Sequence, residues 1–524
     1  MRLIVVFVLL CLFCLGASAL AEVSVVRTFP SNGSIDVDSK VNYIRVRFSE
    51  PVRPDGYSFV NSDQGAFLQF GGNPSFEDGN KLCIVPVKLA PGTTYAVSIN
   101  SDKYQSFRSA ADGTPVTPYL LKFTTLGSSS KNDLGMSSEK WQEDLIYLAT
   151  ELPKRHKNLF FKMTKNEWVS NVQQLRKQIP AMSDTEVMVG LTKLFALIGD
   201  QHTDISVIGN DRLKVMPLFL YWFKDGIFVV GASQEYKNLL GCQVVKIEDV
   251  DVDKACDVVS TLFCYDNDSG RKGKMPRFLA APDFLKSLKL IPSTDTVSLT
   301  LKDHDGKNIT ARIRSVANGT DTKMSRIVNE AADPMPLAGK NPGRAYWAEY
   351  LEKEKLIYFK YNQCVDSSDY PFQKMQSDLE KMLAEHSDAR LVVDIRSNSG
   401  GNSSILDPFI DSLKNNKDFN CKGRLFVITG RRTFSSAVLN ATRLRTETNA
   451  IFVGETACGL PNHYGEVKMF TLPNSGLGVS YSTKYFEYSK EAISLVPDII
   501  TETTFAECLR GEDPALNAII NYHG

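Results

Sequence analysis

The stretch RLVVDIRSNSGGNSS, residues 390–404, contains a short apolar run that two glycines follow. A second stretch, ITGRRTFSSAVLNATRL at residues 428–444, has an apolar run, a polar turn and then residues with helical spacing. Strands that alternate with helices predict a parallel sheet with crossover helices. Because functional residues collect at the carboxyl ends of such strands, we expect Gly400, Gly401, Ser435 and Ser436 at the functional edge of an α/β domain.

Upstream, apolar residues recur with helical spacing in three segments. These segments run from Trp141 to Leu152, from Trp168 to Ile179 and from Val187 to Ile198. Ser183 and Glu186 have the spacing of a capping box, and Gly199 stands where a helix often ends in a left-handed residue. His202 is therefore predicted to follow a rigid helix end.

Residues 22–126 have the period-two pattern of half-buried strands, as in Ile44, Val46 and Phe48. With a turn at Pro91 and Gly92, they predict a small all-β sandwich of immunoglobulin-like size.

Residues 206–320 return to strand-like patterning and predict a second β element. The polar, Gly/Ser-rich stretch within residues 127–136 predicts a flexible linker. The whole chain is thus expected to be multidomain, partly α/β and partly all-β.

The first 21 residues combine Arg2, an apolar run and small residues at Ala17, Ala19 and Ala21, which is the pattern of a secretory signal peptide. We therefore expect a secreted, periplasmic or cell-surface protein with no stable membrane insertion after cleavage.

The mature chain would keep eight scattered cysteines, most of them expected to be small buried residues, and their spacing predicts no metal cluster.

The chain has 60 basic and 60 acidic side chains, and no basic run that would follow a phosphate backbone. Nucleic acid is therefore not an expected partner.

Four segments resemble, in order and approximate spacing, the S41 peptidase family, which includes C-terminal processing peptidases, tricorn core peptidases and retinoid-binding relatives. They are LFALIGDQHTDI (194–205), the two stretches quoted first, and IFVGETACGLPNHYGE (451–466). The resemblance covers residues 137–505. It implies a helical subdomain with the catalytic His at 137–205, a PDZ-like β domain at 206–320 and a ClpP/crotonase-like catalytic domain at 338–510.

The segments of residues 22–126, such as LAPGTTYAVSI, resemble bacterial Ig-like modules, which serve as spacers or adhesive units.

By this resemblance, Ser435 is the nucleophile. In the processing branch a Lys is the base, but Leu460 stands at that position and cannot take a proton. The tricorn branch uses a His instead, and His202 matches it; a neutral imidazole can remove the hydroxyl proton and return it to the leaving amine. Glu491, six residues before Pro497, matches the carboxylate that would orient the imidazole.

The remaining assignments also follow from the resemblance. Gln201 replaces the relay serine of the tricorn pattern, so either Gln201 relays or Glu491 reaches the ring directly. The N–H groups of Gly400 and Ser436 are the expected oxyanion donors. His463 is kept as an alternative base or a substrate contact.

These assignments predict a serine-type peptidase that hydrolyses peptide bonds through an acyl-enzyme on Ser435, acts on a peptide or protein substrate and needs no cofactor. A non-catalytic protein that binds peptides or apolar ligands on the same fold is the alternative, and an adhesin acting through its β module is a third.

Single residues also have alternative interpretations. A helix-capping role for His202 and an exposed-strand role for Glu491 compete with catalysis. Asp394 and Arg396 are expected to form a structural ion pair.

Overall fold

The computed structural model describes residues 23–34, 37, 39, 41–90, 93–125, 136–327, 336–491 and 493–524. The chain divides into two compact units, Met1–Leu134 and Gly135–Gly524. The predicted signal peptide, the turn at Pro91 and Gly92, and all but the last residue of the predicted linker lie outside the described residues.

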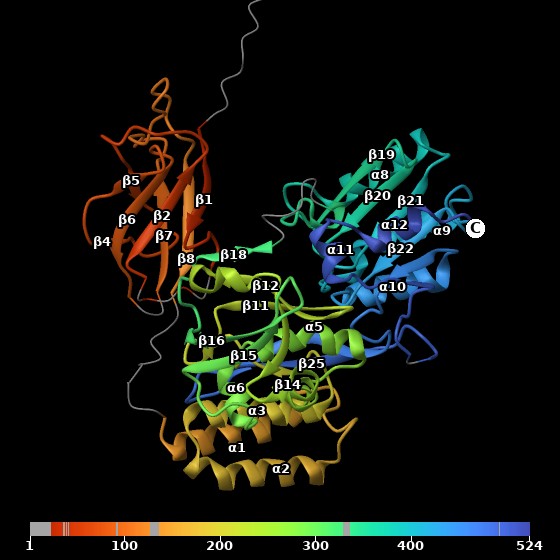
Figure 1. Cartoon of the computed structure of the whole chain (residues 1–524). Helices are drawn as coiled ribbons and strands as arrows, with labels where there is room; N and C mark the ends of the chain where they lie inside the picture. Colours follow the sequence, from red (N-terminus) through yellow and green to blue (C-terminus); the bar gives the residue numbers. More distant parts are fainter. Residues whose placement is uncertain are drawn as a thin grey trace, which may run out of the picture. The chain divides into compact units, whose positions relative to one another are not determined.

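The first unit consists of two antiparallel sheets (Figure 1). One has the order β1 (Val25–Phe29), β2 (Tyr43–Phe48), β6 (Leu82–Lys88) and β4 (Gln69–Phe70), with β5 (Ser75–Glu77) also on β6; the other has the order β3 (Phe59–Asn61), β7 (Thr94–Ile99) and β8 (Tyr119–Thr124). Ile44, Val46 and Phe48 are buried in a core to which both sheets contribute. The alternating pattern therefore predicted these strands correctly, because each strand buries one face.

The second unit begins with three helices, α1 (Ser138–Arg155), α2 (Lys165–Gln178) and α3 (Asp184–Ile198), which lie side by side in Figure 1. The side chains of Ser183 and Glu186 form the predicted capping box of α3, and Gly199 ends the helix with φ +79°. Glycine adopts a left-handed backbone conformation at little cost in energy. The chain therefore turns sharply away from the helix axis just before His202.

The predicted β element forms a seven-stranded sheet with the central order β11 (Leu218–Phe223), β12 (Gly226–Ser233), β13 (Gln243–Ile247), β15 (Thr296–Lys302) and β16 (Asn308–Arg314). β14 (Val250–Asp251) pairs with β13, and β18 (Met324–Arg326) pairs with β12. The helices α4 (Val252–Val259), α5 (Asp268–Leu279) and α6 (Pro282–Ser287) come between β14 and β15. A separate pair joins β10 (Lys214–Val215) to β17 (Val316–Ala317).

The C-terminal sheet has the order β19 (Tyr346–Leu351), β20 (Leu356–Tyr361), β21 (Arg390–Asp394), β22 (Leu425–Thr429), β23 (Ile451–Gly454) and β26 (Ile499–Ile500). All neighbours are parallel except β19 and β20. The helices α8 (Phe372–Glu385), α9 (Asp407–Asn415) and α10 (Ser436–Glu447) bury their apolar residues against one face, and α12 (Pro514–Ile520) covers the other. The parallel sheet with crossover helices is thus confirmed.

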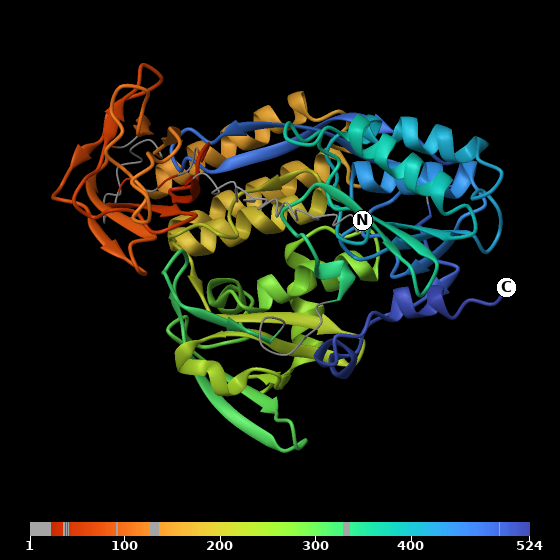
Figure 2. The same cartoon turned by 90° about the horizontal axis from the view of Figure 1, so that it is seen from above.

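A further three-stranded sheet joins distant parts of the second unit. β24 (His463–Thr471) pairs with β25 (Gly478–Phe486), and β25 pairs with β9 (Asp204–Ile205), which begins two residues after His202. Figure 2 shows the long blue strands running beside the orange and yellow helices. This pairing holds the segment that follows α3 against β25.

Eight cysteines of the described chain are free, and five of them are buried, which agrees with the expectation for most of them. Within the described residues, no helix is both long and apolar enough to cross a membrane, and no cluster of three or more His, Cys, Asp or Glu is arranged to hold a metal ion.

Candidate active site

Ser435 occupies a strained turn between β22 and α10. Its φ is +53° and its ψ is −129°, a backbone conformation that residues other than glycine rarely adopt. The hydroxyl of Thr433 donates to the Ile395 carbonyl at 2.9 Å, and the N–H of Phe434 donates to the Asn398 carbonyl at 3.0 Å. The loop after β21 therefore holds the turn that presents Ser435 at the start of a helix, which is the arrangement of a nucleophile elbow.

The two glycines after β21 pack directly against this turn. Gly400 has φ +108°, and a Cβ built on it would lie 2.7 Å from the Cβ of Ser435 and 3.0 Å from the nitrogen of Ser436. Gly401 has φ +133°, and its Cβ would lie 2.2 Å from the Cys364 carbonyl oxygen. Only glycine allows the loop this close approach. The structure thus brings Gly400, Ser435 and Ser436 together, as the sequence predicted.

The N–H groups beside Ser435 differ in their bonding. The N–H of Gly400 donates to Asn398 Oδ1 at 2.9 Å, so this expected oxyanion donor already has a partner. Within the described chain, the N–H groups of Gly401 and Ser436 donate to no protein acceptor. Ser436 is the first residue of α10, where free N–H groups and the helix dipole favour negative charge.

His202 lies in a stack of three rings. Its ring centroid is 4.4 Å from that of Phe434, with 20° between the planes, and 5.2 Å from that of His463, with 10° between the planes. The imidazole thus contacts the residue before Ser435. Its side chain is 7% exposed, and within the described residues its buried Nε2 has no hydrogen-bond partner, so no hydrogen bond joins it to Ser435.

The surroundings of His202 keep it neutral. Burial lowers the pKa of the imidazole from its usual 6.5 to about 4, and the charges of His463 and Lys274 act in the same direction. Asp200 opposes them, with its Oδ1 3.8 Å from His202 Nδ1. A neutral imidazole has a free lone pair, so His202 can accept a proton across the physiological pH range.

Asp200 anchors the turn that carries His202, a role that the sequence analysis missed. This buried carboxylate accepts hydrogen bonds from His156 Nε2 at 3.1 Å, from the hydroxyls of Thr203 and Ser482 at 2.6 Å each, and from the N–H of His202 at 3.0 Å. Burial alone would raise the pKa of Asp200, but these donors outweigh it and hold that pKa below its usual range. An Asp two residues before the predicted base was the available indication.

The structure does not bring Glu491 to the imidazole. Its side chain is exposed, and within the described residues its carboxylate makes no hydrogen bond or ion pair with His202. Gln201 turns elsewhere: its Nε2 donates to Asp266 Oδ2 at 2.6 Å and to the Cys458 carbonyl at 3.3 Å. Among the described residues, neither alternative for coupling Glu491 to His202 is seen; the N–H groups of Tyr488 and Ser489, just before Glu491, donate to Asn462 Oδ1.

His463 has a defined tautomer. Its Nδ1 lies 2.8 Å from the Leu460 carbonyl oxygen, so Nδ1 carries the proton and Nε2 is left as an acceptor. Burial lowers the pKa of His463, although the bond to Leu460 partly opposes this. Leu460, which stands where the resemblance implied a lysine, therefore orients the second imidazole through its main-chain carbonyl.

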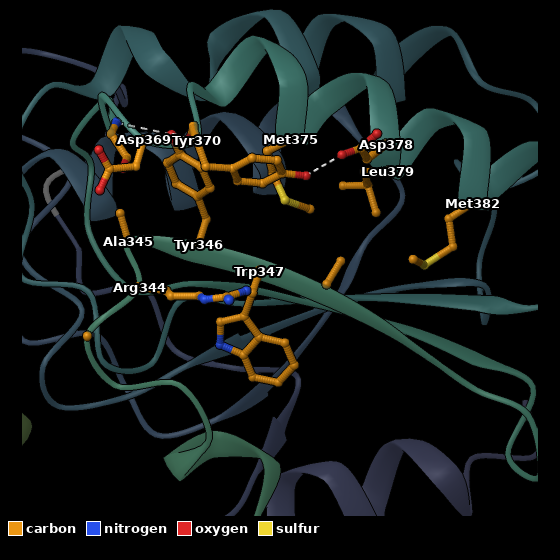
Figure 3. Close-up of a pocket in the computed structure, with 13 residues that line it drawn as sticks. Arg344, Ala345, Tyr346, Trp347, Asp369, Tyr370, Met375, Asp378, Leu379 and Met382 are labelled. Atoms are coloured by element: carbon orange, nitrogen blue, oxygen red, sulfur yellow. Dashed lines mark hydrogen bonds between the residues drawn. The ribbon is translucent and has the colours of Figure 1, made fainter. Parts of the chain in front are cut away.

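Two other features are separate from this site. A cavity of about 550 Å³ between β19 and α8, with Arg344 and Tyr370 in its lining, includes none of the predicted site residues (Figure 3). Asp394, which is fully buried, pairs with Lys360 at 3.0 Å and with Arg396 at 2.9 Å. Burial would raise the pKa of Asp394, but these cations hold it below its usual range. The expected ion pair between Asp394 and Arg396 is therefore present.

A protein-family comparison gives a match for the N-terminal unit. Residues 21–125 match the family model of the bacterial Ig-like domain. The N-terminal unit is therefore a bacterial Ig-like domain, which confirms the resemblance of its segments. No curated protein matches the sequence.

Among solved structures, the chain is similar to mature CPAF, with 14% identity and a TM-score of 0.49, over 73% of this chain and 98% of that one. It is similar to the photosystem II D1 C-terminal processing protease, with 12% identity and a TM-score of 0.34, over 72% of this chain and 96% of that one. It is also similar to the tricorn protease, with 12% identity and a TM-score of 0.35, over 92% of this chain and 45% of that one.

Proposed function

We propose that this protein is a secreted serine-type peptidase that hydrolyses peptide bonds through an acyl-enzyme on Ser435. The observation that carries the proposal is the strained Ser435 turn, packed against Gly400 and preceded by Phe434, on which a neutral, buried His202 is stacked. A strained serine at a strand-to-helix turn, free N–H groups and a neutral imidazole are the components that acyl transfer needs.

In the proposed reaction, the Ser435 oxygen attacks the carbonyl carbon of the scissile bond while His202 takes the hydroxyl proton. The C–N bond then breaks, and His202 returns the proton to the leaving amine. Water, deprotonated by the same imidazole, hydrolyses the ester and restores the Ser435 hydroxyl.

Oxyanion stabilisation is assigned to two main-chain groups. Among the residues that the structure describes, the N–H of Ser436 and the N–H of Gly401 have no protein acceptor, so both are available to the negative oxygen of the tetrahedral intermediate. Gly400 lets the loop approach the serine. Its own N–H is bonded to Asn398 Oδ1, so it becomes a third oxyanion donor when that bond breaks or when the N–H divides between both acceptors.

Asp200 takes the place proposed earlier for Glu491 as the carboxylate nearest the imidazole. Its Oδ1 is 3.8 Å from His202 Nδ1, which is too long for a hydrogen bond but close enough to stabilise the imidazolium that forms during attack. Because it also accepts a hydrogen bond from the main-chain N–H of His202, it holds the turn that carries the ring.

A second candidate function has an observation in its favour. Ser435 and His202 share no hydrogen bond in the described chain, and Glu491 is exposed. A protein that binds peptides or apolar ligands without cleaving them would need neither contact.

The test is covalent labelling of the purified mature protein with a fluorophosphonate probe, which reacts with activated serines. We expect labelling to disappear in Ser435→Ala and to persist in Ser399→Ala, a matched control at an exposed serine of the same glycine loop. Absence of labelling and of peptide hydrolysis in the folded wild type would favour the binding protein instead.

A further inference from the structure

An aromatic groove lies on the Ig-like unit, and none of its lining residues belongs to the candidate active site. Four rings at its rim are unusually exposed: Tyr57 (45%), Phe67 (40%), Phe70 (38%) and Tyr104 (52%). They surround a cavity of about 710 Å³, with Phe59 between Tyr57 and Phe70 at centroid distances of 6.3 and 5.6 Å. Exposed apolar rings that gather around a hollow mark an interaction site more often than scattered ones do.

One wall of this groove is the free edge of a strand. β3 is the terminal strand of its sheet and pairs only with β7 among the described strands. The Ser58 carbonyl accepts from the Asn100 N–H at 3.1 Å, and Val60 lies opposite Ser98, so these two residues direct their main-chain groups toward β7. Because the direction alternates along an antiparallel strand, Phe59 and Asn61 direct theirs outward, along the groove.

The lack of charged side chains in the lining of the groove narrows the class of ligand that fits it. None of the residues that line it is Asp, Glu, Lys, Arg or His. An ionised ligand group would lose its hydration there without gaining a partner of opposite charge. The amides of Asn61 and Asn73 supply neutral donors and acceptors at the rim, and within the described residues neither side chain has a hydrogen-bond partner.

We propose that this groove binds an extended, uncharged peptide segment, which adds to β3 as a further strand. Its main chain would pair with the outward groups of Phe59 and Asn61, and an apolar or aromatic side chain at every second position would lie among the rings of Tyr57, Phe67 and Tyr104. The free strand edge favours a peptide over a glycan, because a sugar chain can stack on rings but lacks a regular ladder of N–H and C=O groups. The Ig-like unit is then a peptide-binding module in its own right.

The test uses the full-length chain with Ser435→Ala, so that no probe is cleaved. The probes are an array of acetylated and amidated heptapeptides without charged residues, with an apolar or aromatic residue at every second position. Affinity for the strongest binder is measured by fluorescence anisotropy. We expect Phe67→Ala and Tyr104→Ala each to weaken binding about 10-fold or more, since central aromatic anchors carry most interface energy.

The control is Phe29→Ala, which removes a ring of the same unit that is 42% exposed but lies outside the groove, and which should leave affinity unchanged. In an added strand, the N–H groups of every second residue face β3. N-methylation of those residues of the peptide should abolish binding, whereas N-methylation of the alternate residues should be tolerated. Absence of any heptapeptide binder, equal weakening by Phe29→Ala, indifference to both N-methyl series, or binding of cellohexaose in place of peptides would each overturn the proposal.

Discussion

At the scale of single residues, the site depends on two imidazoles in one stack. His202 contacts Phe434, and its buried Nε2 has no partner in the part of the chain that the structure describes, while His463 has its Nδ1 bonded to the Leu460 carbonyl. Both have lowered pKa values because they are buried. Both imidazoles are neutral proton acceptors, so substitution of each one separates their roles.

The first prediction separates the two imidazoles. We expect His202→Ala to lower kcat/KM by about 10²–10⁴-fold, the usual contribution of a general base, while His463→Ala retains most of the turnover and changes KM. The measurement is steady-state hydrolysis of a fluorogenic peptide, with circular dichroism as the control for folding. Full activity of His202→Ala combined with loss in His463→Ala would show that His463 is the base.

The second prediction concerns pH. With the pKa of His202 lowered to about 4, the ring stays neutral on acidification well past 6.5, so kcat/KM should fall to half its plateau only near pH 4. In the unfolded chain the ring would protonate near 6.5, so the contribution of His202 to stability grows as pH rises from about 4 to 6.5 and is constant above that range.

The same experiment has an internal comparison. His463→Phe keeps a ring in the stack but removes a charge that lowers the pKa of His202, so the acid limb should move to higher pH. Rates and circular dichroism are measured over one pH series. An acid limb near 6.5 in the wild type would contradict a buried base.

At the scale of elements, two loops position the reacting groups. The loop after β21 packs on the turn after β22, and the turn after α3 is held by Asp200 and by the pairing of β9 with β25. Capping and glycine signals in the sequence predicted the helix end and the glycine loop. They could not predict Asp200 as the anchor, because its donors His156 and Ser482 lie far from it along the chain.

The third prediction tests the contact between these loops. In Gly400→Ala the new Cβ would meet Ser435 Cβ at 2.7 Å in a backbone conformation that alanine rarely adopts. We expect turnover to fall by about 10²-fold or more, comparable to the loss of one oxyanion donor, while the rest of the sheet stays folded. Fluorophosphonate labelling rate and the melting temperature are the two readouts.

Gly306→Ala is the matched control, since Gly306 also has a positive φ of +77° but its Cβ would meet no atom within 4 Å. It should lower stability slightly through backbone strain and leave the labelling rate unchanged. Equal effects of the two substitutions on labelling would mean that backbone strain, and not the approach to Ser435, is responsible.

At the scale of the whole molecule, the Ig-like unit and the remainder have separate cores. The first unit buries its own apolar residues, and every proposed catalytic group belongs to the second. Compact units with their own cores commonly fold independently.

The fourth prediction therefore concerns truncation. A chain that begins at Met136 should remain soluble and should hydrolyse a small unstructured peptide with a kcat/KM close to that of the full chain. Residues 22–126 alone should show no hydrolysis. A truncated enzyme that is well folded by circular dichroism but inactive would mean that the Ig-like unit completes the active site.

The amino-acid sequence by itself determined the local structure of this protein. Period-two and helical spacing predicted the strands and helices, Ser183 and Glu186 predicted a cap, and the two apolar runs before Gly400 and Ser435 predicted neighbouring parallel strands. Each of these features depends on interactions between residues that are near in the chain or on a simple periodicity, so single-sequence reasoning reaches them.

Only the tertiary structure decided which side chains meet His202. Glu491 had the spacing that the resemblance implied, yet it is exposed. Phe434 and His463, which lie more than two hundred residues further along the chain, instead stack on the ring. Contacts of that separation depend on the packing of whole elements, which spacing along the chain does not encode. The same holds for the aromatic groove, whose rings come from separate strands and loops and share a surface only after the sandwich folds.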